Sequence, residues 1–282
     1  MAVLCYITSD NIRDSKSNVH ESPFLFESVP YIQNGDIDLY YEHEKRGDSP
    51  TIIFVHGYLG SNLTWKQIGY LRQVQNFSTL VFDRRGYGQS SKPTDPARYT
   101  MMEKCSDIVA LMDNTGLSQA VVWGFSGGGR ITFGMMKYHP DRLSAAIIGG
   151  MSPYTLPPEY DMDLRIKLLD EGMDSVLDNF QAMYGTQPKN LRETLMKNDP
   201  EAIKADVITS KAFEGFAGDM QFFDTPLMLY AGTEDPFFAG CKRASKVIPN
   251  CRFLALEGLG HYETLVKTRR FLPDVLDFLK EI

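Results

Sequence analysis

Short runs of consecutive apolar residues recur along the chain and predict the strands of a sheet. Runs without polar alternation are typical of strands that are buried on both faces. They stand at residues 51–55, 80–82, 120–123, 145–148, 227–230 and 253–256. Ahead of them, residues 28–33 and 37–42 predict a pair of strands joined by a turn at Asn34-Gly35, a dipeptide typical of hairpins.

Segments with apolar residues at helical spacing separate these strands. The clearest is 101–115, where Thr100 and Glu103 can form a capping box and Gly116 supplies the stop. Further helices are predicted at 127–138, 237–248 and 273–281. The alternation of strands and helices predicts an α/β fold with a mainly parallel central sheet flanked by helices. Active sites of such sheets lie at the carboxyl ends of the strands.

The alternation stops between residues 152 and 222. This stretch opens with three prolines and then shows the spacing of short helices. They are predicted at about 162–171, 173–184, 188–197 and 199–213. We therefore expect an all-helical insertion at 152–222 within one α/β domain made of 26–151 and 223–282. Residues 1–25 are expected to form a loose N-terminal extension, because most of them are polar and show no period.

Length, composition and charge narrow the class of protein. A chain of 282 residues with 43% hydrophobic and 23% charged residues suits one large α/β domain. The formal charge is 29 − 36 = −7, the sign opposite to that of a general polyanion binder, so we expect no nucleic-acid partner. No apolar run reaches the roughly 18 residues of a membrane span. The first residues lack a basic region, so we expect no signal peptide and a cytoplasmic location.

The four cysteines form no CxxC pair and have no metal-ligand spacing with histidine. We therefore expect free thiols and no metal site. The glycine run Gly127–Gly129 lacks the G-x-G-x-x-G pattern of a dinucleotide site, so we expect no cofactor of that kind.

The pattern G-x-S-x-G stands at 124–128, between a predicted strand and a predicted helix. A serine on so tight a turn is exposed above the sheet, and glycines two residues before and after it leave room for the turn. The N-terminus of the following helix favours developing negative charge. The pattern predicts that Ser126 is a nucleophile; the alternative is an ordinary structural turn of small residues.

A serine nucleophile needs a base, and the base needs a carboxylate that orients it. His261 follows the last predicted strand, on what we expect to be a flexible loop, and is the predicted base; its alternative role is a structural hydrogen bond. Asp235, in the loop after 227–230, is the predicted acid. Glu234 is the nearest rival, and Asp235 could instead cap the helix that follows.

These residues in the chain order Ser126, Asp235, His261 resemble the α/β-hydrolase fold family. Phe-Val-His-Gly-Tyr at 54–58 resembles the family's HG-x loop, and Asp-Arg-Arg-Gly-Tyr-Gly-Gln-Ser at 83–90 resembles its D-x-R-G-x-G-x-S turn. The resemblance covers about residues 28–151 and 223–282. It implies that the helical insertion is the cap, or lid, of this family.

The resemblance also implies an oxyanion hole made of the backbone N–H groups of Tyr58 and Gly127. It implies structural roles for His56 and Asp83. Position 127 departs from the family, which often has a larger residue there. Haloalkane dehalogenases and epoxide hydrolases of this family carry aspartate at the elbow, whereas the serine at 126 implies acyl transfer.

The sequence thus predicts a serine hydrolase of carboxylesterase or lactonase type that acts on a small-molecule substrate through an acyl-enzyme. Methionine and aromatic residues in 152–222 favour an adaptable apolar pocket, and no arginine cluster there indicates a bound phosphate or carboxylate. We therefore expect small to medium, mostly apolar esters or lactones. One alternative is a carbon–carbon bond hydrolase or cofactor-free perhydrolase on the same triad. Another is a small-molecule receptor of the same fold, with slow turnover and a large ligand-induced thermal shift.

Overall fold

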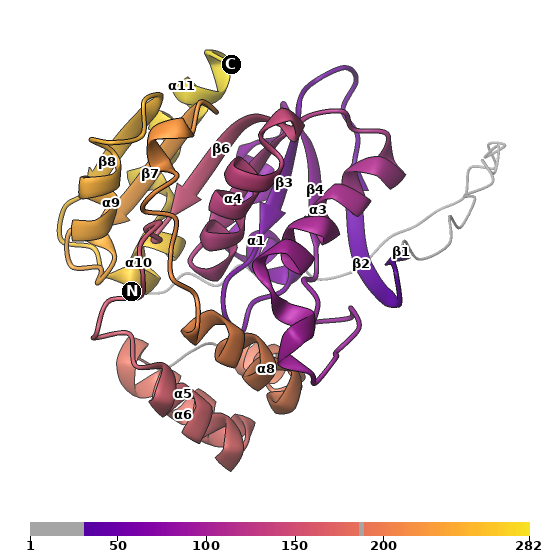
Figure 1. Ribbon diagram of the computed structural model, residues 1–282, viewed down its shortest axis with the longest axis vertical. Helices are drawn as coiled ribbons and strands as arrows, with labels where there is room; N and C mark the ends of the chain where they lie inside the picture. The colour runs from indigo at the N-terminus through magenta and orange to yellow at the C-terminus, as the bar shows by residue number, and fades with distance from the viewer. Residues whose placement is uncertain (1–30, 186–188) are drawn as a thin grey trace, which may run out of the picture.

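An eight-stranded twisted sheet runs through the protein and carries helices on both faces (Figure 1). The computed structural model describes residues 31–185 and 189–282, so the predicted N-terminal extension at 1–25 lies outside the described residues. The strands are β1 (Tyr31–Asn34), β2 (Ile37–Glu44), β3 (Thr51–Val55), β4 (Ser78–Phe82), β5 (Ala120–Phe125), β6 (Leu143–Gly149), β7 (Leu227–Gly232) and β8 (Cys251–Leu256).

The strand order in the sheet is β1-β2-β4-β3-β5-β6-β7-β8. Strand β2 pairs antiparallel with both β1 and β4, and all other neighbours are parallel. This confirms the predicted α/β fold with a mainly parallel sheet. The first hairpin is present, but its two-residue turn is Gly35-Asp36, because Asn34 still pairs with Ile37 as the last residue of β1. The Asn34 side chain donates instead to Asp107 Oδ1, at 2.9 Å.

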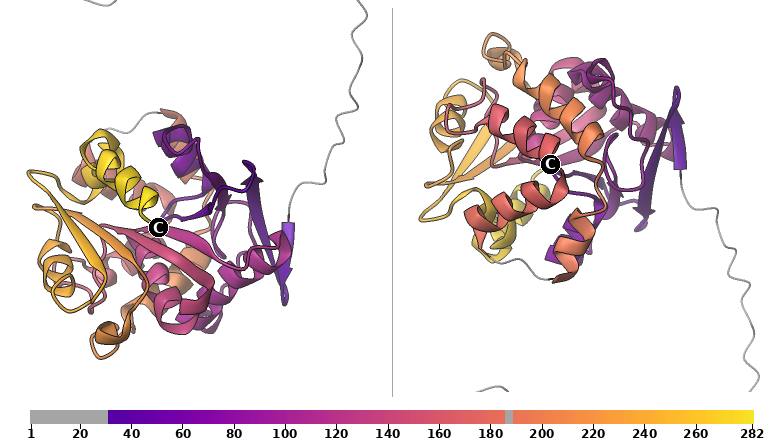
Figure 2. Two further views of the ribbon diagram at one scale, coloured as in Figure 1. Left: turned by 90° about the horizontal axis from the view of Figure 1, so that it is seen from above. Right: turned by 90° about the horizontal axis from the view of Figure 1, so that it is seen from below.

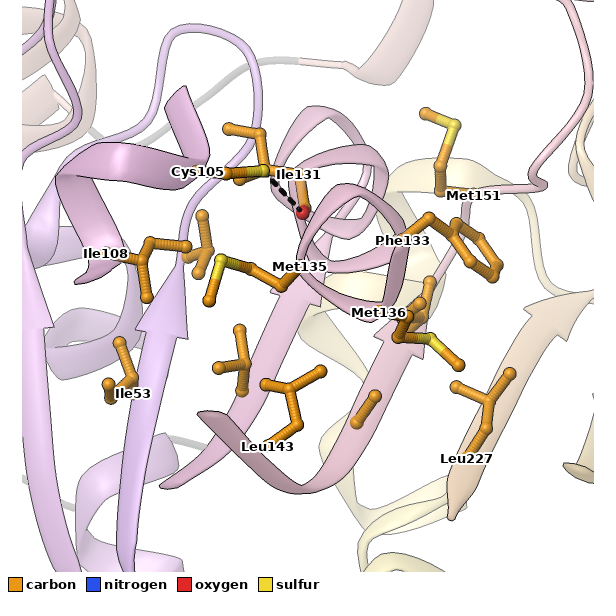
Figure 3. Close-up of a cluster of buried hydrophobic side chains, with 14 of the residues drawn as sticks. Ile53, Cys105, Ile108, Ile131, Phe133, Met135, Met136, Leu143, Met151 and Leu227 are labelled. Carbon is orange, nitrogen blue, oxygen red and sulfur yellow. Dashed lines mark hydrogen bonds between the residues drawn. The ribbon is translucent and has the colours of Figure 1, made fainter. Parts of the chain in front are cut away.

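Different helices cover the two faces of the sheet. One face packs against α3 (Met101–Thr115), α4 (Gly127–Tyr138) and α9 (Phe238–Ala244), and Figure 3 shows part of this cluster. The other face packs against α1 (Asn62–Ile68), α2 (Tyr70–Gln73) and α11 (Leu272–Lys280). Along β3, Ile53 belongs to the first cluster and Phe54 to the second. Since both faces are covered, alternation of polar and apolar residues disappears from the sequence.

Several helices match their predicted ranges closely. Helix α3 begins as predicted at Thr100, whose hydroxyl accepts from the Glu103 N–H, and ends at Gly116 in the left-handed conformation. The Glu103 carboxylate accepts from Arg85 at 2.5 Å, so it pairs with a buried guanidinium and does not take part in the helix cap. Helix α9 ends at Ala244, four residues before the predicted end. Helices α1, α2 and α10 (His261–Val266) were not predicted.

Between β6 and β7, the described residues form helices and turns without a strand. The helices are α5 (Met162–Glu171), α6 (Met173–Tyr184), α7 (Lys189–Leu195) and α8 (Pro200–Lys211). In Figure 1, α5, α6 and α8 gather at one end of the sheet, and the view from below in Figure 2 shows these pink and orange helices lying over it. Their apolar side chains pack against Leu59 and Tyr87, which follow β3 and β4. None of the helices in the described part of the chain is both long and apolar enough to cross a membrane.

A buried ion cluster ties the first hairpin and the turn after β4 to α3. The guanidinium of Arg85 donates to both carboxylate oxygens of Asp107, at 2.7 Å each. Both side chains are almost fully buried. Burial raises the pKa of Asp107 above its ordinary value. The bound Arg85 acts in the opposite direction but does not cancel the rise. Removing Asp107 would leave the buried Arg85 with only the half-exposed Glu103 carboxylate as a counter-charge and would take an acceptor from Asn34.

We expect Asp107→Ala to lower the free energy of unfolding by about 2–4 kcal/mol, less than the roughly 3–5 kcal/mol of a fully unpaired buried charge, because Glu103 still faces Arg85. The matched control is Asp113→Ala on the same helix, whose side chain is 65% exposed and pairs with Arg142. That change should cost at most about 1 kcal/mol. Urea unfolding of the three proteins measures both values, and equal losses would contradict a structural role for the buried cluster.

Candidate active site

Ser126 occupies a strained turn between β5 and α4. Its backbone angles are φ 53° and ψ −121°, in a region that residues other than glycine rarely adopt. The turn is held from the neighbouring strand, because the Ser126 N–H donates to the carbonyl of Gly149 at 2.9 Å. The result is a hydroxyl presented at the carboxyl end of β5, where the sequence pattern predicts it.

Close packing around this turn explains the glycines of the pattern. A side chain at Gly124 would overlap the carbonyl of Gly128 and the hydroxyl of Thr132. A side chain at Gly128 would overlap the carbonyl of Val55, the last residue of β3. Helix α4 can therefore begin directly after Ser126 only because its first turn has no side chain at 128.

The three residues predicted as a triad lie together. His261 Nε2 is 3.0 Å from Ser126 Oγ, and His261 Nδ1 is 2.9 Å from Asp235 Oδ2. The Asp235 side chain is completely buried, whereas that of His261 is 13% exposed. With Nδ1–H donated to the carboxylate, Nε2 is left to accept the serine hydroxyl proton.

Asp235 contacts the predicted base, but it is not the N-cap of α9; that cap is Phe237, and no side chain bonds there. One carboxylate oxygen accepts from His261, and the other accepts from the Phe237 N–H at 2.9 Å, which closes the turn ahead of α9. The rival Glu234 is exposed.

His261 does not lie on a flexible loop, contrary to our expectation. It is the first residue of α10, after the cap residue Gly260. The carboxylate of Glu263 accepts from the Gly260 N–H at 2.9 Å, and the Thr264 hydroxyl donates to the Gly260 carbonyl at 2.8 Å. These two bonds fix the start of the helix, and with it the imidazole.

The backbone of Tyr58 comes close to that of Gly127. A methyl group built on Gly127 would lie 3.8 Å from the Tyr58 nitrogen. Gly127 is the first residue of α4, and the first N–H groups of a helix have no partner within it. The nitrogens of Tyr58 and Gly127, which the family resemblance assigns to an oxyanion hole, therefore belong to backbone segments that approach each other beside Ser126.

His56 and Asp83 make contacts of a structural kind. His56 is fully buried; its Nε2 accepts from the Arg84 N–H at 3.1 Å, and its Nδ1 lies 3.0 Å from the Gly57 carbonyl. Burial, with the nearby Arg84 charge, lowers the pKa of His56 to about 3, so this imidazole is neutral. Asp83 accepts from the backbone N–H groups of Asn62 and Gln89, at 2.6 and 2.8 Å.

A cavity of about 50 Å³ is lined by Tyr58, Gly127 and residues of α5 and α8, among others; Ser126 and His261 do not line it. Part of its lining is apolar, but four cations also line it. They are Arg84, Lys104, Arg130 and Arg165. The expectation of a mostly apolar pocket is therefore wrong. The four cations stand far apart in the chain, on the turn after β4 and on α3, α4 and α5, so they form no cluster in the sequence.

Asp206 of α8 lies among these cations. It accepts from Arg84 Nη2 at 2.5 Å and from the Tyr87 hydroxyl at 2.8 Å, and it pairs with Lys104. Although burial opposes its charge, Lys104 and Arg84 hold the pKa of the Asp206 carboxyl well below its ordinary value. Burial lowers the pKa of Arg130 to about 10, which still leaves its guanidinium charged at neutral pH. Arg165 stacks over the rings of Tyr58 and Tyr160, 4.4 and 4.0 Å from their centres.

Comparisons with known proteins identify the family of this chain. A family model described as alpha/beta hydrolase fold matches residues 50–201, more than half of the chain. The chain belongs to the alpha/beta hydrolase fold family. It is therefore an alpha/beta hydrolase by sequence as well as by architecture.

Individual relatives of this alpha/beta hydrolase differ in their named activities. Bifunctional epoxide hydrolase 2 of Sus scrofa is 36% identical over 100 residues, which are 35% of this chain and 18% of that protein. The chain spans 18–28% of the length of three mammalian proteins of that name. A bifunctional esterase/perhydrolase of Acinetobacter calcoaceticus is 22% identical over 275 residues, 89% of this chain and 99% of that protein.

Solved structures share the fold of this alpha/beta hydrolase at low identity. An enol-lactonase from Burkholderia xenovorans has a TM-score of 0.79 and 21% identity, over 89% of this chain and 100% of that chain. An esterase from Exiguobacterium antarcticum has a TM-score of 0.77 and 19% identity, over 90% and 100% of the two chains.

We expect Gly128→Ala to lower the free energy of unfolding by at least about 3 kcal/mol, because the added methyl overlaps backbone that has little freedom to move. Gly127→Ala is the matched control in the same helical turn. The methyl group of Gly127→Ala would make one tight contact, at 3.3 Å to Arg84 Nη1, without overlapping backbone. Because alanine is a better helix former than glycine and offsets this contact, the stability of this variant should stay within about 1 kcal/mol of the original. Thermal and urea unfolding check both values; a well-tolerated Gly128→Ala would refute the steric explanation of the G-x-S-x-G glycines.

Proposed function

We propose that this alpha/beta hydrolase is a serine hydrolase that cleaves carboxylic esters or lactones through an acyl-enzyme. The observation that supports the proposal most is the hydrogen-bonded series Ser126–His261–Asp235, with separations of 3.0 and 2.9 Å. A serine activated in this way attacks carbonyl carbon. The named activities of two relatives, an esterase/perhydrolase and an enol-lactonase, are compatible with this chemistry.

In the proposed reaction, Ser126 Oγ bonds to the carbonyl carbon while its proton passes to His261 Nε2. Asp235 stabilises the imidazolium that forms. The negative charge that develops on the carbonyl oxygen is bound by the N–H groups of Tyr58 and Gly127. His261 returns the proton to the departing alcohol oxygen. Water, deprotonated by His261, then opens the acyl-enzyme and restores the serine.

We also propose that helices α5–α8 form a cap, as the division at 152–222 predicts. Two contacts support this role. The ring of Tyr160, just ahead of α5, has its centre 6.5 Å from that of His261. The carboxylate of Asp206 on α8 binds Arg84 of the core. A cap anchored at these points would bound the acyl side of the site and restrict the size of the substrate.

We expect Ser126→Ala to reduce kcat by about 10⁴-fold or more on a panel of p-nitrophenyl esters, C2 to C12, and acyl lactones. The physical reason is the loss of the only atom that becomes bonded to the acyl group. The unfolding temperature is the control and should be unchanged within a few degrees, because the hydroxyl contributes little packing. Turnover by Ser126→Ala at the original rate would rule out the proposed nucleophile.

The acid is tested by Asp235→Asn against Glu234→Gln, two isosteric changes at neighbouring positions. The amide introduced by Asp235→Asn keeps an oxygen for the Phe237 N–H but cannot hold the imidazole in the required tautomer, so kcat should fall by about 10⁴-fold. Glu234→Gln changes an exposed side chain and should leave kcat within a factor of two. The opposite result, with only the Glu234 variant impaired, would reassign the acid.

A further inference from the structure

The cavity beside Tyr58 and Gly127 holds more positive charge than the protein neutralises. Arg84, Lys104 and Arg130 are only 5%, 6% and 5% exposed. Among the described residues that line the cavity, Asp206 is the one acid, and it is bound to Arg84 and Lys104. Buried charges are normally paired, because taking an isolated charge out of water is costly. This imbalance suggests that the missing negative charge comes from a ligand.

Arg130 is the cation of the lining that has open donors and no carboxylate partner; Arg84 Nε is also without a hydrogen-bond partner among the described residues, but Arg84 is bound to Asp206. Arg130 lies in the first turn of α4, four residues after Ser126. Its Nη1 makes a long bond of 3.3 Å to the Ser210 carbonyl, and its Nη2 has the sulfur of Met151 at 3.8 Å. Its Nε has no hydrogen-bond partner within residues 31–185 and 189–282. A buried guanidinium that lines a cavity and has unused N–H groups is suited to bind a carboxylate by two parallel hydrogen bonds.

The place of the cavity shows which part of a substrate would enter it. Its lining includes Tyr58 and Gly127, whose N–H groups are the proposed oxyanion donors beside Ser126. Arg84 Nη1 would lie 3.3 Å from a methyl group on Gly127, so the cationic lining adjoins the proposed oxyanion hole. A group held here would be attached to the carbonyl carbon that Ser126 attacks. It would therefore belong to the acyl part and not to the departing alcohol.

The volume limits the length of that group. About 50 Å³ accommodates three to five water-sized groups, at roughly 10–15 Å³ for each. A carboxylate with one or two methylenes fits this space, whereas a long chain does not.

We propose that the substrate is an ester or lactone whose acyl part carries a short carboxylate arm, and that Arg130 binds this carboxylate. The inference rests on the serine-hydrolase function proposed above and specifies its substrate class. Arg84 and Lys104 act as positioning residues: Asp206 holds them in place, and their charge favours an anion in the same cavity.

The test compares kcat/KM for monoethyl succinate with that for ethyl 4-methylpentanoate, in which an isopropyl group replaces the carboxylate at nearly the same shape. We expect the protein to prefer the succinate monoester by about 10²-fold or more. Arg130→Met should reduce this preference by a similar factor, mainly through KM, since the arm is bound equally in ground state and transition state. Lys137→Met, a matched loss of one cation from α4 at a position that pairs with Asp219, should leave the preference unchanged.

A binding measurement keeps the inference separate from the proposed function. In the Ser126→Ala background, calorimetry at fixed ionic strength should detect succinate bound one to one. Adding Arg130→Met should weaken that binding by about 10²-fold or more. Succinate binding that is absent, or that does not depend on Arg130, would overturn the inference. Serine-dependent hydrolysis of the neutral ester without preference for the carboxylate ester would also overturn it and leave the serine-hydrolase proposal intact.

Discussion

The contact of the first turn of α4 with the end of β3, at Gly128, is the constraint on which the rest of the site depends. The Val55 carbonyl fills the place that a side chain at 128 would take. Helix α4 can therefore start directly after Ser126 and bring its first N–H next to the backbone of Tyr58. The cost is the left-handed conformation of Ser126, which the bond from its N–H to Gly149 maintains. A strained residue of this kind persists only because the sheet on either side of it is rigid.

The parallel sheet assembles side chains that are 135 residues apart in the chain. Strands β7 and β8 are neighbours that end in register, with Gly232 opposite Leu256. The loops that follow them therefore leave the same edge of the sheet. Each loop is then fixed locally: Asp235 closes its turn through the Phe237 N–H, and His261 begins a capped helix. Local hydrogen bonds thus position the imidazole and the carboxylate, and neither depends on Ser126 for its place.

Most strands and the longer helices could be predicted from the sequence, because continuous apolar runs and caps such as Thr100 and Gly116 are local signals. The short helices α1, α2 and α10 were missed, since four to seven residues are too few to show a helical period. The grouping of Ser126, Asp235 and His261 was expected from motif and order, but the helical start at His261 was not. The cationic cavity was missed for a different reason. Lys104 and Arg130 look like ordinary helix residues until α8 brings Asp206 to them.

Two buried charge clusters contain the adjacent residues Arg84 and Arg85. Negative charge is in excess in the Arg85 cluster, and positive charge is in excess in the Arg84 cluster. Arg85 binds two carboxylates, those of Asp107 and Glu103, so its charge is more than neutralised within the fold. On the other side, Asp206 alone faces Arg84, Lys104 and Arg130 among the described residues that line the cavity. Helix α3 contributes to both clusters, with Glu103 and Asp107 in the first and Lys104 in the second. The buried guanidinium of Arg85 is fully compensated by the fold. The deficit beside the proposed oxyanion donors is therefore better explained by an anion that binds and leaves with the substrate.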